Sequence, residues 1–316
     1  MKYLNVRRVI KISHNRFLLI LDTGAGFWQD MHHVLGQLLA AELANRAPIV
    51  FWSKNSMYGM PEAENAFEYF FLPVSGYTVH DLTDVALTWY PQGCNAQDVL
   101  TLRPGELKKK FPASPVVEKD ADVIAHNSDT GIEEPARLID RRHPLCGLNS
   151  KELYHAMLQK YIRLQPGIQR EIDHFYQENL AGGPVIAVHI RGSDKVLEVP
   201  HLNELNKQYP AAIDRFLDAA PSARIFFMTD CFDILEEYKG RYGDLLVHTD
   251  CKRVLRYDEG VHYKHYSDKK RKGLDIIKDT WLAAKCDYFI GNGYSNVSRA
   301  ISELKQWKDS SINLLY

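Results

Sequence analysis

The sequence predicts an α/β protein made of two Rossmann-like domains, and three observations lead to this prediction. The chain has 316 residues, more than one ordinary hydrophobic core accommodates. Its first half contains a strand, a glycine turn, a helix and another strand in succession. Its second half contains three apolar runs that each end in polar or glycine-rich residues, as buried parallel strands do. We therefore expect an N-terminal domain over residues 1–178 and a C-terminal domain over residues 179–316.

The first half begins with strand patterns. Residues 3–12 form one candidate strand and residues 16–21 a clearer one. After a glycine turn, apolar residues recur at helical spacing and predict a helix that ends before Pro48; these are Met31, Leu35, Leu38, Leu39 and Leu43. Residues 49–52 form the next strand.

The glycine turn contains Gly24 and Gly26, which together could cradle a phosphate. Gln29 occupies the place of the third glycine of a dinucleotide-binding turn, and no nearby acidic residue is placed for a ribose. A nicotinamide site is therefore disfavoured. A tight turn without any ligand contact remains an equal alternative.

Residues 53–150 are rich in aromatic side chains and in prolines, and we expect irregular structure with short helices there. Asp120-Ala121-Asp122 fits the Asp-x-Asp pattern of metal-dependent sugar-transfer enzymes, although such pairs also occur by chance. No His or Cys cluster has zinc spacing. We predict no metal site.

A helical region is expected from Ser150, a candidate N-cap, to Gly182. The periodicity that follows predicts the crossover helices of the second domain; they cover residues 209–219, 235–242, 274–285 and 297–307.

The central motif of the second half is the strand Val185–Ile190 together with the residues that follow it. Ligands of open α/β sheets bind past the carboxyl ends of the strands. Arg191 there offers a planar fork and Lys195 a point charge, both suited to phosphate, and Gly192 allows close backbone approach. The alternative is a solvated arginine beside an Asp194–Lys195 surface pair. The strands at 224–228 and 287–290 end in Thr229-Asp230 and in a glycine-rich turn before Ser295-Asn296.

Composition narrows the class of protein. The formal net charge of -1 and the pI of about 6.9 argue against a nucleic-acid binder that depends on a basic field. No apolar run is long enough for a transmembrane helix, and the first residues do not resemble a signal peptide. The five cysteines are scattered, so reduced thiols in a cytoplasmic protein are expected.

Four spaced motifs resemble the core α1,6-fucosyltransferases and the nodulation-factor fucosyltransferases. His189-x-Arg191-x-x-Asp194-Lys195 is similar to their His-x-Arg-Arg-Thr-Asp-Lys, and Thr229-Asp230 to a Thr-Asp at the next strand end. Asp279 stands eight residues before Asp287, as in the family. Residues 295–299 resemble Ser-Gln-Val-Cys-Arg. The glycine turn, with residues 52–58, resembles the start of the nodulation enzymes.

The resemblance implies two Rossmann-like domains facing a cleft, the GT-B-like arrangement of glycosyltransferases. It also implies an inverting, metal-independent transfer of fucose from GDP-fucose, without any further cofactor. Arg191 would stabilise the departing diphosphate, and His189 and Asp279 would meet the guanine. The whole set of expected donor-binding residues is His189, Asp194, Lys195, Asp230, Asp279, Ser295, Asn296, Gly24 and Gly26.

This chain departs from the family pattern at two positions. Gly192 replaces the second arginine, and the glutamate that would act as general base stands nine rather than ten residues after the histidine, at Glu198. Glu198 is our first choice for the base, with Asp30 and Asp194 as alternatives.

The expected acceptor is a glycan or a lipid-linked oligosaccharide in bacterial surface polysaccharide synthesis. The enzyme would be cytoplasmic, with peripheral contact to the membrane as an option. Two other functions remain open: a transferase for another GDP-hexose, and a non-catalytic sugar-nucleotide or glycan binding protein.

Overall fold

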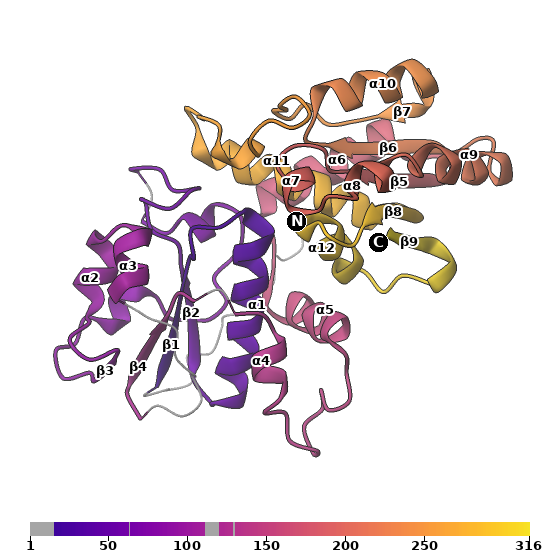
Figure 1. Ribbon diagram of the computed structural model, residues 1–316. Coiled ribbons are helices and arrows are strands. Elements are labelled where there is room, and N and C mark those ends of the chain that lie inside the picture. Colours follow the sequence, from indigo (N-terminus) through magenta and orange to yellow (C-terminus); the bar gives the residue numbers. More distant parts are fainter. Residues whose placement is uncertain (1–15, 63, 111–119, 129) are drawn as a thin grey trace, which may run out of the picture. The chain divides into compact units, whose positions relative to one another are not determined.

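The computed structural model describes residues 16–62, 64–110, 120–128 and 130–316 (Figure 1). The candidate strand over residues 3–12 lies outside these ranges. The chain divides between Arg163 and Leu164 into two compact units.

This division lies before the expected boundary at 178/179, because helix α6 (Pro166–Asn179) belongs to the second unit. The α6 helix packs on α11 (Lys269–Lys285), and two ion pairs join these helices. Lys278 lies 3.1 Å from Glu171, and Lys285 lies 2.8 Å from Asp173. The expected continuous helix is in fact two, α5 (Ser150–Tyr161) and α6, since Pro166 begins a new helix.

The first unit has a parallel four-stranded sheet in the order β2-β1-β4-β3. Its strands are β1 (Phe17–Leu21), β2 (Ala47–Phe51), β3 (Trp89–Tyr90) and β4 (Val123–His126). All five residues of β1 are buried, as expected of a central strand covered on both faces. The α1 helix (Phe27–Leu43) makes the crossover from β1 to β2, which confirms the predicted strand–turn–helix–strand unit.

The remaining elements of the first unit are short. The α5 helix and α4 (Glu133–Ala136) pack against α1. The N-cap of α5 is Asn149 rather than the expected Ser150, because the Asn149 side chain accepts the Glu152 N–H in a reciprocal capping box. The other helices are η1 (Ala66–Tyr69), η2 (Val79–Leu82), α2 (Ala96–Thr101) and α3 (Pro104–Lys110).

The second unit has a parallel five-stranded sheet in the order β7-β6-β5-β8-β9. The strands are β5 (Val185–Ile190), β6 (Arg224–Thr229), β7 (Leu246–Val247), β8 (Tyr288–Asn292) and β9 (Ile312–Leu315). The order runs outward from β5 in both directions, as in a doubly wound sheet. The order in which the chain adds strands to the sheet therefore reverses beside β5, and sheets of this kind bind ligands at such a point.

Helices cover this second sheet, and the α/β class is confirmed in both units. Besides α6 and α11 they are α7 (Lys195–Glu198), α8 (Leu202–Asn206), α9 (Tyr209–Ala219), α10 (Phe232–Tyr242), α12 (Asn296–Leu304), η3 (Gly243–Leu245), η4 (Val261–Tyr263) and η5 (Asp309–Ser311). The predicted crossover over 209–219 matches α9, and the other three helices begin before their expected first residues. Among the described residues, no helix is long and apolar enough to cross a membrane.

Candidate functional site

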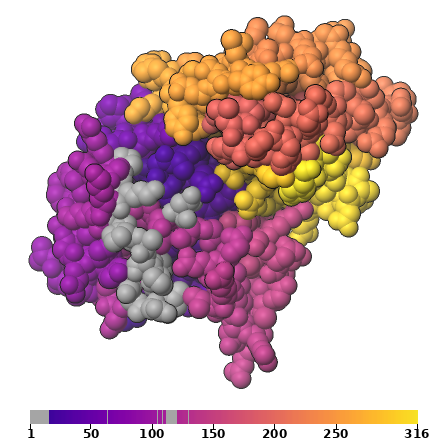
Figure 2. Space-filling view, viewed as in Figure 1, coloured from indigo at the N-terminus to yellow at the C-terminus, as the bar shows by residue number. Residues whose placement is uncertain are grey.

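A cavity of about 110 Å³ opens at the carboxyl ends of β5 and β6 in the second unit. Residues at the two strand ends, a loop and two helices line it. The loop covers residues 251–266 and lies on the surface of the second unit, in orange in Figure 2. The polar lining residues are His189, Arg191, Thr229, Asp230, Lys252, His262, Tyr266, Lys272, Asp275 and Asp279. Four of the residues expected from the sequence therefore meet here: His189, Arg191, Asp230 and Asp279.

Arg191 is held by two carboxylates. Its guanidinium lies 2.6 Å from the Asp194 carboxylate and 3.0 Å from that of Asp230. Burial works against its charged form, but Asp230 and Asp194 outweigh burial and raise the pKa of Arg191. Burial alone would raise the pKa of Asp230, yet Arg191 and the Ser193 hydroxyl together lower it. Both groups are therefore ionised, and the arginine fork is fixed in place.

Gly192 is required by close packing. A Cβ atom at this position would clash with the Ile234 side chain and lie 3.1 Å from the Cys231 sulfur. The Gly192 N–H donates to Asp230 at 2.9 Å. With Ile234 in this position the packing favours glycine, and the second arginine of the family pattern would require the end of the Ile234 side chain to shift.

His189 lies at the end of β5 and is buried. Its Nδ1 is 2.8 Å from the Ser298 hydroxyl of α12. Burial lowers its pKa, so the imidazole is neutral near pH 7. A neutral ring with one nitrogen engaged leaves the other for a ligand in the cavity.

Asp279 lies in the middle of α11 and faces the cavity. The Thr249 hydroxyl donates to one carboxylate oxygen, and burial raises the pKa of Asp279 to about 6. Arg253 in turn holds the segment that carries Thr249, because its guanidinium donates to the carbonyls of Thr229, Cys251 and Thr249. The carboxylate is thus oriented by a fixed loop.

Two lysines and an aromatic ring on the cavity wall are missing from the sequence prediction. Lys252 and Lys272 lie 4.6 Å and 5.2 Å from the ring centroid of Tyr266. Their chain neighbours are basic, so the sequence pattern there is that of a solvated charge run. The spacing of Lys272, Asp275 and Asp279 on one face of a helix is the signal that would have identified this wall.

Lys195 and Glu198 form an ion pair with each other within the short helix α7. The Glu198 side chain is 59% exposed. Neither residue is among the described residues that line the cavity. The structure thus places the expected base on an open surface of the second unit, where its role stays a prediction.

Ser295 and Asn296 also do not line the cavity. Ser295 is the N-cap of α12 and is buried, and Asn296 is the first residue of that helix. The α12 residues that do reach the cavity region are Val297, which lines it, and Ser298, which contacts His189. The expected contact of Ser295 and Asn296 with phosphate remains a prediction.

The glycine turn of the first unit is stabilised from within. Gly24 has a φ of 77°, which favours glycine, whereas a Cβ on Gly26 would meet nothing within 4 Å. The Asp30 carboxyl accepts the N–H and hydroxyl of Thr23. Burial and the neighbouring Asp22 raise the pKa of Asp30 to about 8. Asp30 is 1% exposed, so it supports the turn rather than offering an open base.

Both aspartates of the Asp-x-Asp pattern, at the amino end of β4, already have partners within the first unit. Asp120 pairs with Arg16, and Asp122 accepts the Thr88 N–H and hydroxyl at 2.8 Å and 2.6 Å. Among the described residues, no group of three or more His, Cys, Asp or Glu side chains could hold a metal ion.

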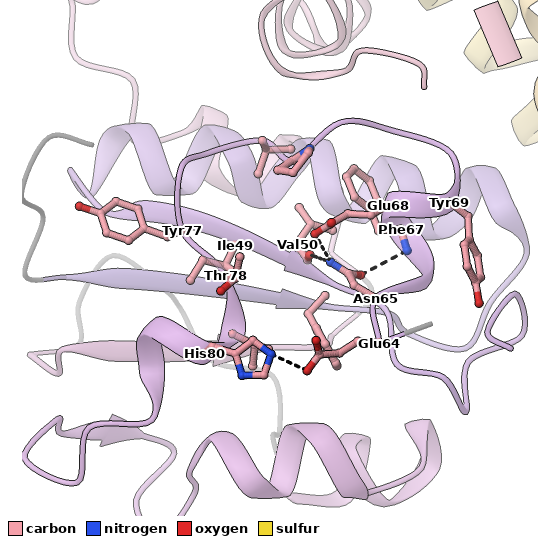
Figure 3. Close-up of a pocket in the computed structure, with 14 residues that line it drawn as sticks. Ile49, Val50, Glu64, Asn65, Phe67, Glu68, Tyr69, Tyr77, Thr78 and His80 are labelled. Carbon is pink, nitrogen blue, oxygen red and sulfur yellow. Dashed lines mark hydrogen bonds and ion pairs between the residues drawn. The ribbon is translucent and has the colours of Figure 1, made fainter. Parts of the chain in front are cut away.

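A second cavity of about 310 Å³ runs along edge strand β2 of the first unit (Figure 3). The Asn65 side chain donates to the Val50 carbonyl and accepts the Phe67 N–H, so it covers the strand edge. Glu64 and His80 pair at 2.7 Å across the opening. The described residues that line this cavity include no lysine or arginine.

Known proteins resemble the chain in sequence and in fold. The family model of the alpha-(1,6)-fucosyltransferase N- and catalytic domains matches residues 135–313, more than half of the chain. The NodZ alpha-1,6-fucosyltransferase soaked with GDP-fucose is 20% identical and has a TM-score of 0.59, with 95% of this chain and 98% of that chain covered. Fucosyltransferase NodZ from Bradyrhizobium is 19% identical and has a TM-score of 0.60, with 96% of this chain and 98% of that chain covered. POFUT1 in complex with GDP-fucose is 14% identical and has a TM-score of 0.57, with 96% of this chain and 98% of that chain covered.

The family match contains all the described residues that line the cavity beside β5. The structural matches show the same α/β fold with parallel sheets. The chain therefore belongs to the α-(1,6)-fucosyltransferase family and is a glycosyltransferase.

Proposed function

We propose that this enzyme transfers fucose from GDP-fucose to a glycan acceptor, with inversion and without a metal ion. The observation that carries the proposal is the cavity at the carboxyl ends of β5 and β6, which combines an oriented carboxylate, a buried imidazole and fixed cations. The solved structures of similar fold that contain GDP-fucose support it. In this proposal the two units are the Rossmann-like domains of a GT-B-like enzyme, with the donor in the second.

Asp279 is the proposed reader of the guanine. A guanine edge presents two N–H donors, and a carboxylate accepts both. Thr249 occupies one lone pair of one oxygen, and the carboxylate of Asp279, which lines the cavity, keeps further acceptor sites for a ligand. His189 lines the same cavity and would meet the base with its second nitrogen.

The reaction breaks the bond between the anomeric carbon of the sugar and the terminal phosphate oxygen, which keeps the electron pair. The acceptor hydroxyl oxygen forms the new bond to the anomeric carbon, and its proton passes to a base. Arg191 is the proposed stabiliser of the charge that develops on the diphosphate. Glu198 is the proposed base, since its carboxylate is exposed and close in sequence to the Arg191 loop.

We further propose a cytoplasmic enzyme of bacterial surface polysaccharide synthesis, acting on a soluble or lipid-linked acceptor. Donor discrimination tests the core of the proposal. GDP should raise the midpoint of thermal unfolding by mass action, and UDP should not. Equal stabilisation by both nucleotides would contradict the guanine assignment. Among GDP-hexoses, GDP-fucose should give the fastest transfer.

The pairing of Glu198 with Lys195 also suits a binding protein that has lost catalysis, because the pair occupies the proposed base. Release of GDP from GDP-fucose separates these functions. An enzyme releases GDP slowly without acceptor and rapidly with it, whereas a binding protein releases none. EDTA should leave the rate unchanged; loss of activity in EDTA and recovery with Mn²⁺ would contradict the metal-independent mechanism.

A further inference from the structure

We propose that Lys272, together with Lys252, forms the diphosphate subsite of the donor cavity. The inference rests on the proposed use of a nucleoside-diphosphate sugar. It assigns the diphosphate of the donor to two lysines that lie outside the family-like motifs.

Arg191, the proposed stabiliser of the leaving group, cannot by itself compensate the two charges of a diphosphate. Its guanidinium already contacts the carboxylates of Asp194 and Asp230, so this cluster carries no net positive charge. Lys195 pairs with Glu198. A dianionic ligand in the cavity therefore requires additional cations if its charge is to be compensated.

Lys272 and Lys252 are those cations. The Lys272 ammonium donates to the His262 carbonyl at 2.7 Å, and the Lys252 ammonium donates to the His265 carbonyl at the same distance. In the described part of the chain, neither ammonium lies within ion-pair distance of a carboxylate. Each keeps further N–H donors for a ligand, because an ammonium has three.

Burial of the charged Lys272 ammonium is unfavourable when no anion is bound in the cavity. Its side chain is 8% exposed, and burial with the charges of Lys269 and Lys252 lowers its pKa. Burial likewise lowers the pKa of His262, and the charges of Arg191 and Lys272 lower it further. The charges of Arg191 and Lys272 thus both act on the His262 imidazole, against those of Asp194 and Asp230. A bound anion would relieve this repulsion.

The helix spacing matches the length of the ligand. Lys272 and Asp279 are seven residues apart on α11, which is two turns and about 10 Å of helix rise. Both line the cavity, with Asp275 and Ile276 between them on the same face. An extended nucleoside diphosphate spans a similar length from base to terminal phosphate. With the guanine at Asp279, the phosphates reach Lys272.

Binding of guanosine, GDP and UDP to the wild type and to Lys272→Met tests the assignment by calorimetry. Methionine keeps the length of the side chain and removes the charge. GDP affinity should fall about 10- to 100-fold, the usual loss for a charged hydrogen bond, while guanosine affinity stays unchanged. Lys272→Arg should retain most of the GDP affinity. Lys239→Met, at an exposed pair with Glu236 on α10, removes the same charge elsewhere in this unit and should change nothing.

Wild-type GDP affinity in Lys272→Met would overturn the inference while leaving the proposed function intact. A parallel loss of guanosine affinity would also overturn it, because the lysine would then shape the cavity rather than meet phosphate. Failure of the wild type to prefer GDP over UDP would instead contradict the proposed function. If Lys272→Met does not fold, Lys252→Met carries the same test with the same ligands.

Discussion

Both units have ionisable side chains at or near the carboxyl ends of parallel strands, but the charge states of these side chains differ between the units. In the first unit, burial raises the pKa of Asp22 to about 7 and that of Asp30 to about 8, so both carboxyls lean toward the neutral form. In the second unit, Arg191 keeps Asp230 ionised, although the Asp230 side chain is only 9% exposed. Burial thus favours the neutral form of these carboxyls in the first unit, whereas in the second unit a paired arginine keeps the carboxylate charged.

The two cavities also differ in the charged residues that line them. The cavity along β2 is lined by the half-exposed Glu64–His80 pair and by apolar side chains such as Ile49 (Figure 3). The cavity beside β5 has an arginine and two lysines on its wall. In our proposal a parallel sheet alone does not make a phosphate site, and the cations that line the cavity beside β5 decide it. Four substitutions test this contrast.

Glu198→Gln should have the largest effect. It removes the basic oxygen while keeping size, so transfer to the acceptor should fall by about two to four orders of magnitude with little change in GDP affinity. Glu204→Gln is the matched control, because Glu204 forms the same kind of exposed pair, with Lys207, also three residues apart. Initial rates and GDP titrations measure both. Normal transfer by Glu198→Gln would move the base to another residue.

Arg191→Ala should follow, with a rate loss on the order of 10²–10³ for one lost electrostatic contact. It also leaves Asp230 and Asp194 without their cation, so the second unit should become less stable. Arg241→Ala is the control, since its pair with Asp214 is exposed and lies outside the cavity. Near-native turnover by Arg191→Ala would show that the strand-end charge of the second unit is structural.

The third prediction concerns pH and the first unit. Asp22 and Asp30 keep their protons in the folded state after the unfolded chain has lost them, so their contribution is full below pH 4 and is lost as pH rises toward 7 and 8. Each such carboxyl gives a slope of about 1.4 kcal/mol per pH unit. His33, whose pKa burial lowers to about 3, acts oppositely, but only below pH 6.5.

Between pH 6.5 and 8, the first unit should therefore lose stability, and Asp30→Asn should reduce this loss. Hydrogen exchange of β1, corrected for the intrinsic rate at each pH, measures it. Exchange of β5 serves as the internal reference, because the lowered pKa of Asp230 makes its contribution constant in this range. Equal pH slopes for β1 in the wild type and in Asp30→Asn would contradict the neutral state of Asp30.

Glu64→Gln should have the smallest effect. The pair with His80 is half-exposed, so its loss should change the free energy of unfolding by less than about 1 kcal/mol. GDP affinity should not change, because the cavity along β2 has no cation among its described lining residues. A weakened GDP complex in this variant would show that the first cavity takes part in donor binding.

Local sequence determined most of the secondary structure and the family. The β-branched run Val185–Ile190 can be buried on both faces, and Tyr209–Ala219 has apolar residues at helical spacing; both appear as predicted. The residues at the strand ends followed from the same pattern, since parallel strands bring their carboxyl ends to one edge. His189, Arg191 and Asp230 therefore meet at one cavity, whereas Asp279 of α11, which also lines it, was expected only from the family resemblance.

Only the tertiary structure decided which neighbours each residue has. Gly192 is explained by the Ile234 side chain 42 positions later, and the orientation of Asp279 by the Thr249 hydroxyl. Lys195 is a phosphate candidate by sequence, yet it pairs with Glu198, whereas Lys272 lies in a basic run and faces the cavity. Charge is compensated through space, between side chains whose separation along the chain carries no signal, so the packed structure is needed to find the cations left for a ligand.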